Sequence, residues 1–504
     1  MADAEQSEAA VAGRGAVFLG FQGVAYNLFV LFFYVAIVRL LPQSSVGVVF
    51  GLQSLGALAA VFSSGWVQVA ATRFIAEAFG EKSGEKASQW YITGLGVSCM
   101  IALAACAVIL AAAPEVSRLL FSTAEYSTPV RLYAVDFFFS QLAIAASSGL
   151  QGRSLFGRYA GVYAVYGFLK LGFGIPLLKL GFGVDGVVYA WIISDVFQLA
   201  VFLYMSRGLL GARSNAGVFH ALLSFGLPII ILFSFSALTS NVDRLTILKV
   251  RGTEELAVYG SMLTAAGAVG TVLNSIANAV LPSFSRLNAK GALTASSVTT
   301  AFRYYLVAAI PLVGLAAGVS KPLIALVLGS GYVSGWPAFT ILVSTVGVVS
   351  FASIFSSAFY GAKDSKTPMR VQLASGAVFA ATVVPLIYFY GVTGAALAYV
   401  AANMLSLTLL ARALSKRGLF SLQGSLISKT LAVYLLVFAA TLLSGYAAGF
   451  RTLYLPLYLA IGLAVAAAST KVLKLVGKED VELIASVAPG RIRRWVAKLL
   501  AILT

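Results

Sequence analysis

The stretch LLSFGLPIIILFSFSALTSNVDRLTIL, residues Leu222–Leu248, decides the fold class of this chain. It continues through a polar turn, KVRGTEELAVYG (Lys249–Gly260), into a second apolar segment that ends with ANAVLPSFSRLN (Ala277–Asn288). Each apolar segment is long enough to cross a hydrocarbon core of about 30 Å as a helix. Asp243 and Arg244 lie near the end of the first segment, where a charge is costly unless it faces protein or a cavity. The stretch therefore predicts two membrane-spanning helices with charged residues turned away from lipid.

The composition of the whole chain indicates the same class. Hydrophobic residues make up 60% of the 504 residues, charged residues 11%, and the mean hydropathy is +0.93. These values exclude an ordinary soluble domain. In a membrane protein an excess of Lys and Arg reports topology, so the net charge of +17 does not predict a nucleic-acid partner. The sequence has no Walker loop, HExxH motif or nucleophile elbow, and it predicts neither an enzyme, a cofactor nor a metal site.

The apolar segments predict an all-α polytopic membrane protein with about fourteen transmembrane helices. Their starts fall near residues 16, 46, 90, 130, 159, 184, 221, 255, 300, 337, 370, 392, 429 and 452. An even number of spans puts both termini on one side. Most of the 35 Lys and Arg residues then share that side, so we expect both termini in the cytoplasm and the protein in the cell membrane.

An internal repeat emerges when the sequence is compared with itself at an offset of about 210 residues. IPLLKLGFGVDG (Ile175–Gly186) matches VPLIYFYGVTG (Val384–Gly394), sharing the proline and a G-V-x-G turn. Each copy contains six spans, so both copies insert with the same orientation. Two six-helix lobes related by an axis along the membrane normal are an arrangement that transporters use for alternating access.

These patterns predict how the chain divides. The expected parts are a cytoplasmic tail (1–15), a first lobe (16–207), a cytoplasmic linker (208–220), a second lobe (221–418), two further spans (427–475) and a basic amphipathic tail (478–504). The amphipathic tail is expected to lie on the inner leaflet.

Few polar or charged residues lie inside the predicted spans, and they are the candidate residues of a transport cavity. Lys170 and Asp195 lie at similar depth on consecutive spans, so an ion pair is geometrically possible. That pair would serve either a cavity or only the structure. Asp136 lies in the fourth span. Asn27, beside Tyr26 in the first span, offers a hydrogen-bonding group that suits a sugar, although such residues equally join helices to one another.

A second set of candidates lies at the outer rims of the two lobes. Arg39 lies at the rim of the first lobe, and Asn241, Asp243 and Arg244 lie at the matching rim of the second. Adjacent residues point in different directions on a helix, so Asp243 and Arg244 each need another partner. Asp243 could act as a latch between the rims, or it could cap a neighbouring helix or pair with Lys249.

Several motifs together give the chain a family resemblance. It resembles the polysaccharide and lipid-linked oligosaccharide flippases of the multidrug/oligosaccharidyl-lipid/polysaccharide exporter superfamily. The resemblance rests on VRLLPQSSVGVVF (Val38–Phe50), SGWVQVAATRFIAE (Ser64–Glu77), the pattern FGLPIII…SNVDRLTI…AVYG (Phe225–Gly260), the segment Ile310–Tyr332, and YGAKDSKTP (Tyr360–Pro368). It implies two lobes in a V around a central cationic cavity that handles a polyprenyl-linked sugar at the membrane.

The function that we expect is therefore movement of a lipid-linked oligosaccharide from the cytoplasmic to the outer leaflet. The substrate would carry a polyprenyl phosphate or pyrophosphate, and cationic groups suit such a phosphate. The other expected partners are membrane lipids and glycan-assembly enzymes such as glycosyltransferases or a polymerase. Two alternatives stay open: a cation-coupled multidrug exporter of the same superfamily, and a non-transporting scaffold that recruits glycan-assembly enzymes.

Overall fold

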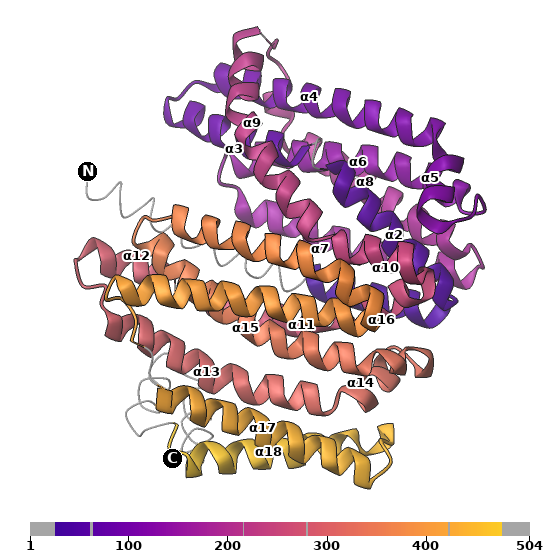
Figure 1. The fold of residues 1–504 in the computed structure, drawn as a ribbon. Coiled ribbons are helices and arrows are strands. Elements are labelled where there is room, and N and C mark those ends of the chain that lie inside the picture. The colour runs from indigo at the N-terminus through magenta and orange to yellow at the C-terminus, as the bar shows by residue number, and fades with distance from the viewer. Residues whose placement is uncertain (1–25, 61–63, 215, 279–280, 422–423, 476–504) are drawn as a thin grey trace. The chain divides into compact units, whose positions relative to one another are not determined.

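The structure of the chain, a computed structural model, describes residues 26–60, 64–214, 216–278, 281–421 and 424–475 (Figure 1). All regular elements among these residues are helices, which confirms the predicted all-α class. The predicted tails 1–15 and 478–504 lie outside the described residues. The chain forms two compact units, a first unit Met1–Ser261 and a second unit Met262–Thr504. The lobe boundaries expected from the sequence remain a prediction.

The first unit begins, within the described residues, with a helix over Tyr26–Leu40. Its other elements are α2 (Gln43–Ala60), α3 (Ser64–Gly80), α4 (Gly84–Ala111), α5 (Ala113–Phe121), α6 (Ser127–Gln151), α7 (Phe156–Lys179), α8 (Gly183–Met205), η1 (Arg207–Leu209), α9 (Ala216–Thr239), α10 (Val242–Arg251) and the start of α11 (Thr253–Asn278). Helix α6 is central, because it packs against α3, α4, α7 and α8. It is also the helix that carries Asp136.

The second unit contains the rest of α11, then α12 (Leu281–Ala289), α13 (Ala295–Gly318), α14 (Ser320–Val327), η2 (Ser330–Gly335), α15 (Trp336–Gly361), α16 (Lys366–Lys416), α17 (Gly424–Ala447), η3 (Thr452–Tyr454) and α18 (Leu455–Val472). Helix α15 packs against α13 and α16, and α17 packs against α13 and α18. The two helices predicted after the repeat are thus α17 and α18, and Figure 1 shows them side by side.

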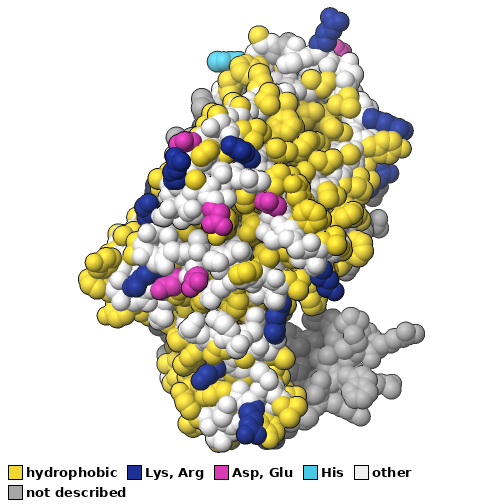
Figure 2. Space-filling model, turned by 90° about the vertical axis from the view of Figure 1, so that its right-hand side faces the viewer, with side chains coloured by type: hydrophobic (Ala, Val, Ile, Leu, Met, Phe, Trp, Pro, Cys, Tyr) yellow, Lys and Arg dark blue, Asp and Glu magenta, His cyan; other side chains and the backbone are white. Residues whose placement is uncertain are grey.

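Eleven helices within the described residues are long and apolar enough to cross a membrane, and two shorter apolar helices accompany them, Tyr26–Leu40 and Ala216–Gly226. One of the eleven, α16, has 51 residues and contains both spans expected from residues 370 and 392. The multi-pass membrane class is therefore confirmed, whereas the number fourteen stays a prediction. Figure 2 shows hydrophobic side chains exposed over much of one face, with charged side chains few and separated.

The two copies of the predicted repeat share an unusual local backbone. Gly183 has φ +59° and its counterpart Gly391 has φ +56°, a conformation that side chains other than glycine rarely adopt. The glycine three residues later closes the turn in both copies. A Cβ on Gly186 would lie 3.3 Å from Leu177 Cβ, and a Cβ on Gly394 would lie 1.9 Å from the carbonyl oxygen of Leu386. Since Leu177 and Leu386 each follow the matching proline, the repeat preserves a tight joint between consecutive spans.

Candidate functional site

A pair of buried carboxyl groups lies in the middle of the first unit. Asp136 on α6 is 6% exposed and Asp195 on α8 is 2% exposed, and the two carboxyl groups lie close enough to interact electrostatically. Two neighbouring buried carboxylates repel one another, so a proton held by the pair relieves that repulsion. The pair therefore titrates as a unit rather than as two independent residues. The arrangement can hold and release a proton inside the helix bundle.

Lys170 on α7 lies next to this pair. Its charge acts on both Asp136 and Asp195. The Nζ atom lies 4.4 Å from the centroid of the Tyr166 ring and 5.7 Å from that of Trp191, a geometry that favours a cation. Within the described part of the chain no salt bridge joins Lys170 to Asp195. The direct ion pair considered from the sequence is thus replaced by aromatic contacts, and Tyr166, which makes one of them, also lies close to Asp195.

Polar and aromatic side chains surround the three charged groups. The ring of Tyr26 stacks on that of Tyr166, with centroids 5.9 Å apart and an interplanar angle of 15°. Gln198, one turn beyond Asp195, is buried, and its Nε2 has no hydrogen-bond partner, as is true of Oδ1 of Asp136. Buried polar atoms without partners are rare in proteins. The cluster therefore retains unused hydrogen-bonding capacity, as a site that receives a proton, an ion or a polar ligand would.

A second cluster lies where α2, α10 and the start of α11 meet. Asp243 is buried, and its Oδ2 accepts a hydrogen bond of 2.5 Å from the hydroxyl of Tyr259, while its Oδ1 accepts one of 2.7 Å from the backbone N–H of Arg244. Asn241, the residue before α10, donates from Nδ2 to the carbonyl of Ala237 at 2.9 Å. Asp243 thus finds its partner on α11, not in Lys249.

Arg244 faces the aromatic side chains of α2 and of the first helix. Its guanidinium carbon lies 6.0 Å from the centroid of Phe50, and Phe50 stacks on Tyr34 with centroids 5.6 Å apart. The Nε atom of Arg244 is buried and has no hydrogen-bond partner among the described residues. The guanidinium group of Arg244 could therefore bind an anionic group without first breaking a salt bridge. Gln53 donates to the hydroxyl of Tyr34 and so holds that ring in place.

Small residues on α2 allow these groups to converge. A Cβ on Gly47 would lie 1.9 Å from the carbonyl oxygen of Thr253, and a Cβ on Gly56 would lie 1.7 Å from the hydroxyl of Tyr133. Helix α2 therefore meets the backbone of α11 at Gly47 and the side chain of Tyr133 from α6 at Gly56. The ring of Tyr133 also contacts that of Trp191 on α8, with centroids 6.0 Å apart. The side chain of Tyr133 thus lies between α2 and α8, the helix that carries Asp195.

The sequence of the first unit and part of the second matches a known family. Residues 36–337, more than half of the chain, match the family model described as "Polysaccharide biosynthesis protein". The chain belongs to this family. None of the curated proteins matches the sequence.

Solved structures share the fold of this polysaccharide biosynthesis family member. The lipid II flippase MurJ, in an inward closed conformation, has a TM-score of 0.73 at 14% identity, with 91% of this chain and 98% of that chain covered. An inward-facing multidrug resistance MATE family transporter of the MOP superfamily has a TM-score of 0.57 at 17% identity, covering 78% and 93%. A MOP superfamily transporter from Pyrococcus furiosus has a TM-score of 0.51 at 18% identity, covering 80% and 95%. At these identities the likeness shows the fold alone.

Among the candidate residues of this family member, the structure brings Asp136, Lys170 and Asp195 together. Asn241, Asp243 and Arg244 lie together at the second cluster. Asn27 is exposed on the first helix, and Arg39 is exposed near the end of the same helix. Whether any of them contacts a substrate stays a prediction.

Sequence reasoning missed several aromatic partners at these clusters. Tyr166 lies four residues before Lys170, a spacing that places both on one helix face, so it could have been found. Tyr259 and Phe50 could not have been found from the sequence, because their proximity to Asp243 and Arg244 depends on how separate helices cross.

Proposed function

We propose that this protein is a flippase that moves a polyprenyl-linked oligosaccharide from the cytoplasmic to the outer leaflet by alternating access. Membership of a polysaccharide biosynthesis family and a fold shared with MurJ and MATE transporters support a transporter of this superfamily. The direction follows from the distribution of Lys and Arg, which favours cytoplasmic termini. The substrate's sugar and phosphate would enter the protein while its hydrocarbon chain stays in lipid or in an apolar recess.

The observation that carries this proposal is Lys170. It lies mid-helix in an apolar span beside two carboxyl groups, and ionisable residues inside a membrane mark substrate or ion pathways. Since no salt bridge to Lys170 forms among the described residues, the cluster retains a cationic group that is not consumed by an ion pair. Such a group suits a phosphate, and the tyrosine hydroxyls and glutamine amides around it suit sugar hydroxyls.

The second unit contains a recess that suits hydrocarbon. A pocket of about 350 Å³ opens between α13, α15, α16 and α17. Its lining is almost entirely apolar, and it includes Leu306, Val348, Phe351, Leu407 and Leu431. Pockets of this size and character hold apolar ligands of moderate length. Part of a polyprenyl chain would fit there, which favours a lipid-linked substrate over a free sugar.

Reconstitution in vesicles with a fluorescent lipid-linked oligosaccharide tests the proposal, with leaflet exchange as the readout. Lys170→Met should abolish exchange and leave folding intact, and Lys170→Arg should retain part of it because the charge stays. Lys179→Met is the matched control, since Lys179 lies on the same helix but is exposed at its end. Exchange by Lys170→Met at the wild-type rate would refute the role of this cluster. No exchange by the wild-type protein would refute the flippase.

The carboxyl pair favours a cation-coupled exporter as the second candidate function. Two neighbouring buried carboxyl groups such as Asp136 and Asp195 can load one proton per cycle, as coupling requires. A pH-dependent or sodium-dependent efflux of cationic drugs, lost in Asp195→Asn, would support the exporter. A scaffold that only recruits glycan-assembly enzymes would keep its activity in Lys170→Met and Asp195→Asn alike, which separates it from both transporters.

A further inference from the structure

The turn in the middle of α16 is aromatic and exposed. Helix α16 consists of two helices joined at Gly391, whose φ of 56° and ψ of −135° interrupt the helical backbone. The three residues before this glycine are Tyr388, Phe389 and Tyr390, and their side chains are 65%, 71% and 63% exposed. Turns that lie in water are built mainly from small and polar residues, whereas exposed apolar patches mark sites that meet a membrane or a partner. This turn is therefore not built to lie in water.

The distance of the turn from the nearest charges matches the thickness of a bilayer. No charged residue lies between Arg370 and Arg412, and both of these arginines are exposed. Their charges are costly in hydrocarbon, so the two arginines mark one boundary of the hydrocarbon core. A helix that rises about 1.5 Å per residue covers about 30 Å from Arg370 to Tyr390, and about 30 Å from Gly391 to Arg412. Since the core is itself about 30 Å thick, the turn reaches the opposite boundary and extends no further.

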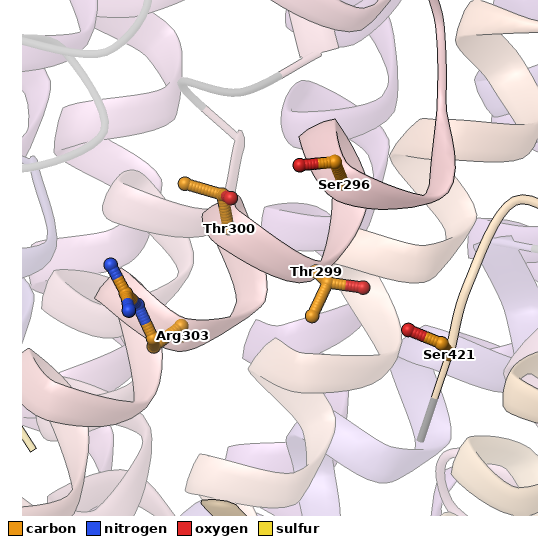
Figure 3. Close-up of a pocket in the computed structure, with 5 residues that line it drawn as sticks. All are labelled: Ser296, Thr299, Thr300, Arg303 and Ser421. Carbon is orange, nitrogen blue, oxygen red and sulfur yellow. The ribbon is translucent and has the colours of Figure 1, made fainter. Parts of the chain in front are cut away.

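The other end of α16 is polar. Its first and last residues, Lys366 and Lys416, are exposed, and a salt bridge of 2.5 Å between Arg417 and Asp364 holds the two ends together. Just after α16, Ser421 lines a pocket with hydroxyl groups and a guanidinium group of α13 (Figure 3), which belong to Ser296, Thr299, Thr300 and Arg303. Charged and hydroxyl groups suit water, whereas the turn at Gly391 presents mainly aromatic side chains. The two ends of α16 therefore suit different surroundings.

The first copy of the repeat shows that the aromatic side chains are not needed to form the turn. The corresponding turn of the first unit has Lys179 and Asp185 where the second copy has Tyr388 and a threonine. Both copies keep a glycine with positive φ, Gly183 and Gly391, so the backbone is alike while the side chains differ. The aromatic residues of the second copy thus serve the surroundings of the turn, not its backbone.

The order of the side chains fits one particular layer of the membrane. Tyrosine is enriched at the boundary between hydrocarbon and headgroups, because its ring is apolar and its hydroxyl group binds polar neighbours. Phe389, which lies between the two tyrosines, adds apolar surface that favours the hydrocarbon side of that boundary. We propose that the turn 388–391 inserts into the headgroup layer of the bilayer and anchors the second unit at a fixed depth. This anchor depends neither on the flippase activity nor on which side the termini lie.

Spin labels on single cysteines of the full-length protein, in vesicles of phosphatidylcholine, test the anchor. The background carries Cys99→Ala and Cys106→Ala. Collisions of the label with oxygen, which concentrates in hydrocarbon, are compared with collisions with a nickel chelate, which stays in water. Phe389→Cys is the test position. Val384→Cys, 45% exposed on the same helix, is the hydrocarbon control, and Ser365→Cys, exposed just before α16, is the water control.

The label at position 389 should give a ratio of oxygen to nickel collisions between those of the two controls, at the depth of the headgroups. A label as accessible to nickel as that at position 365 would overturn the anchor, and so would one as shielded as that at position 384. A label that is shielded only after a lipid-linked oligosaccharide is added would also overturn it, because the aromatic side chains would then form a sugar-binding surface.

A second variant tests whether the tyrosines hold the turn in place. Tyr388→Ser together with Tyr390→Ser should shift the collision ratio at position 389 toward that of the water control. Tyr204→Ser is the matched control, since Tyr204 is 65% exposed on α8 of the first unit, and it should leave the ratio unchanged. An unchanged ratio in the double variant, or an equal shift in the control, would show that these tyrosines do not anchor the turn.

Discussion

Replacing Gly47 with alanine tests the close packing of α2 against α11. A Cβ at this position would lie 1.9 Å from the carbonyl oxygen of Thr253 and 2.8 Å from its Cα. The obstacle is backbone, so no side-chain rotation relieves it. Since Cβ atoms essentially never approach other atoms within 3.0 Å, the two helices must separate locally by about 1 Å. Overpacking of this kind costs about 1–3 kcal/mol.

That cost would shift the balance between closed and separated helices roughly 5- to 150-fold. The shift can be measured with a single cysteine at Ile247, which is 0% exposed and lies on α10 next to the contact. In a background where Cys99 and Cys106 are alanine, Gly47→Ala should raise the rate of maleimide labelling at position 247 by that factor. If the contact closes one side of an alternating-access cycle, transport should also slow while substrate binding is retained.

Gly96→Ala serves as the matched control. Gly96 lies in α4, and a Cβ there would meet no atom within 4 Å. This substitution should leave labelling unchanged and raise stability by about 0.5–1 kcal/mol, because alanine favours a helix over glycine. Equal labelling rates and equal unfolding temperatures for Gly47→Ala and Gly96→Ala would refute the packing of α2 on α11 and the reasoning built on it.

Three further predictions follow from single contacts. Tyr259→Phe and Asp243→Asn should each lower the free energy of unfolding by about 1–3 kcal/mol, and the double variant should lose little more, because both changes remove the same charge-assisted hydrogen bond; fully additive losses in denaturant titrations would contradict this. The hydroxyl and backbone N–H of Thr367, together with Arg417, lower the pKa of Asp364 to about 2, so its contribution is complete above pH 4, near the ordinary pKa of 3.8, and is lost as the pH falls through about 2. Asp364→Asn should therefore cost at most about 1 kcal/mol at neutral pH, since the ion pair with Arg417 is screened by solvent, and nothing at the lowest pH; a constant difference in unfolding temperature across that range would refute the assignment. Single cysteines should react from outside near Ser122, Thr253 and Phe450 but only after permeabilisation near Ser83, Ala289 and Ser365; reversed labelling at two or more of these sites would overturn the topology.

The fold class of this protein was predictable because its signals are local. Whether a segment crosses a membrane depends on its own length and apolarity. The bilayer then requires a helix, because backbone groups in its core find no water to bind. For the same reason the repeated joint at Gly183 and Gly391 was visible as a sequence match, since both glycines serve the backbone of their own turn. The depth of Asp136, Lys170 and Asp195 within their spans could also be predicted from the sequence, because depth along a helix follows from counting residues.

The partners of those charged groups were decided only by the tertiary structure. The matched depth of Lys170 and Asp195 predicted an ion pair between them. The rotation of α6 and α8 about their axes instead places Asp195 beside Asp136, and the ammonium group of Lys170 lies over the ring of Tyr166. Leu306 and Leu431 line one apolar pocket although more than a hundred residues separate them, which no spacing rule predicts. Contacts between helices depend on rotation, crossing angle and closest approach, and these are determined by packing at places such as Gly47 and Gly56, where the sequence shows only a missing side chain.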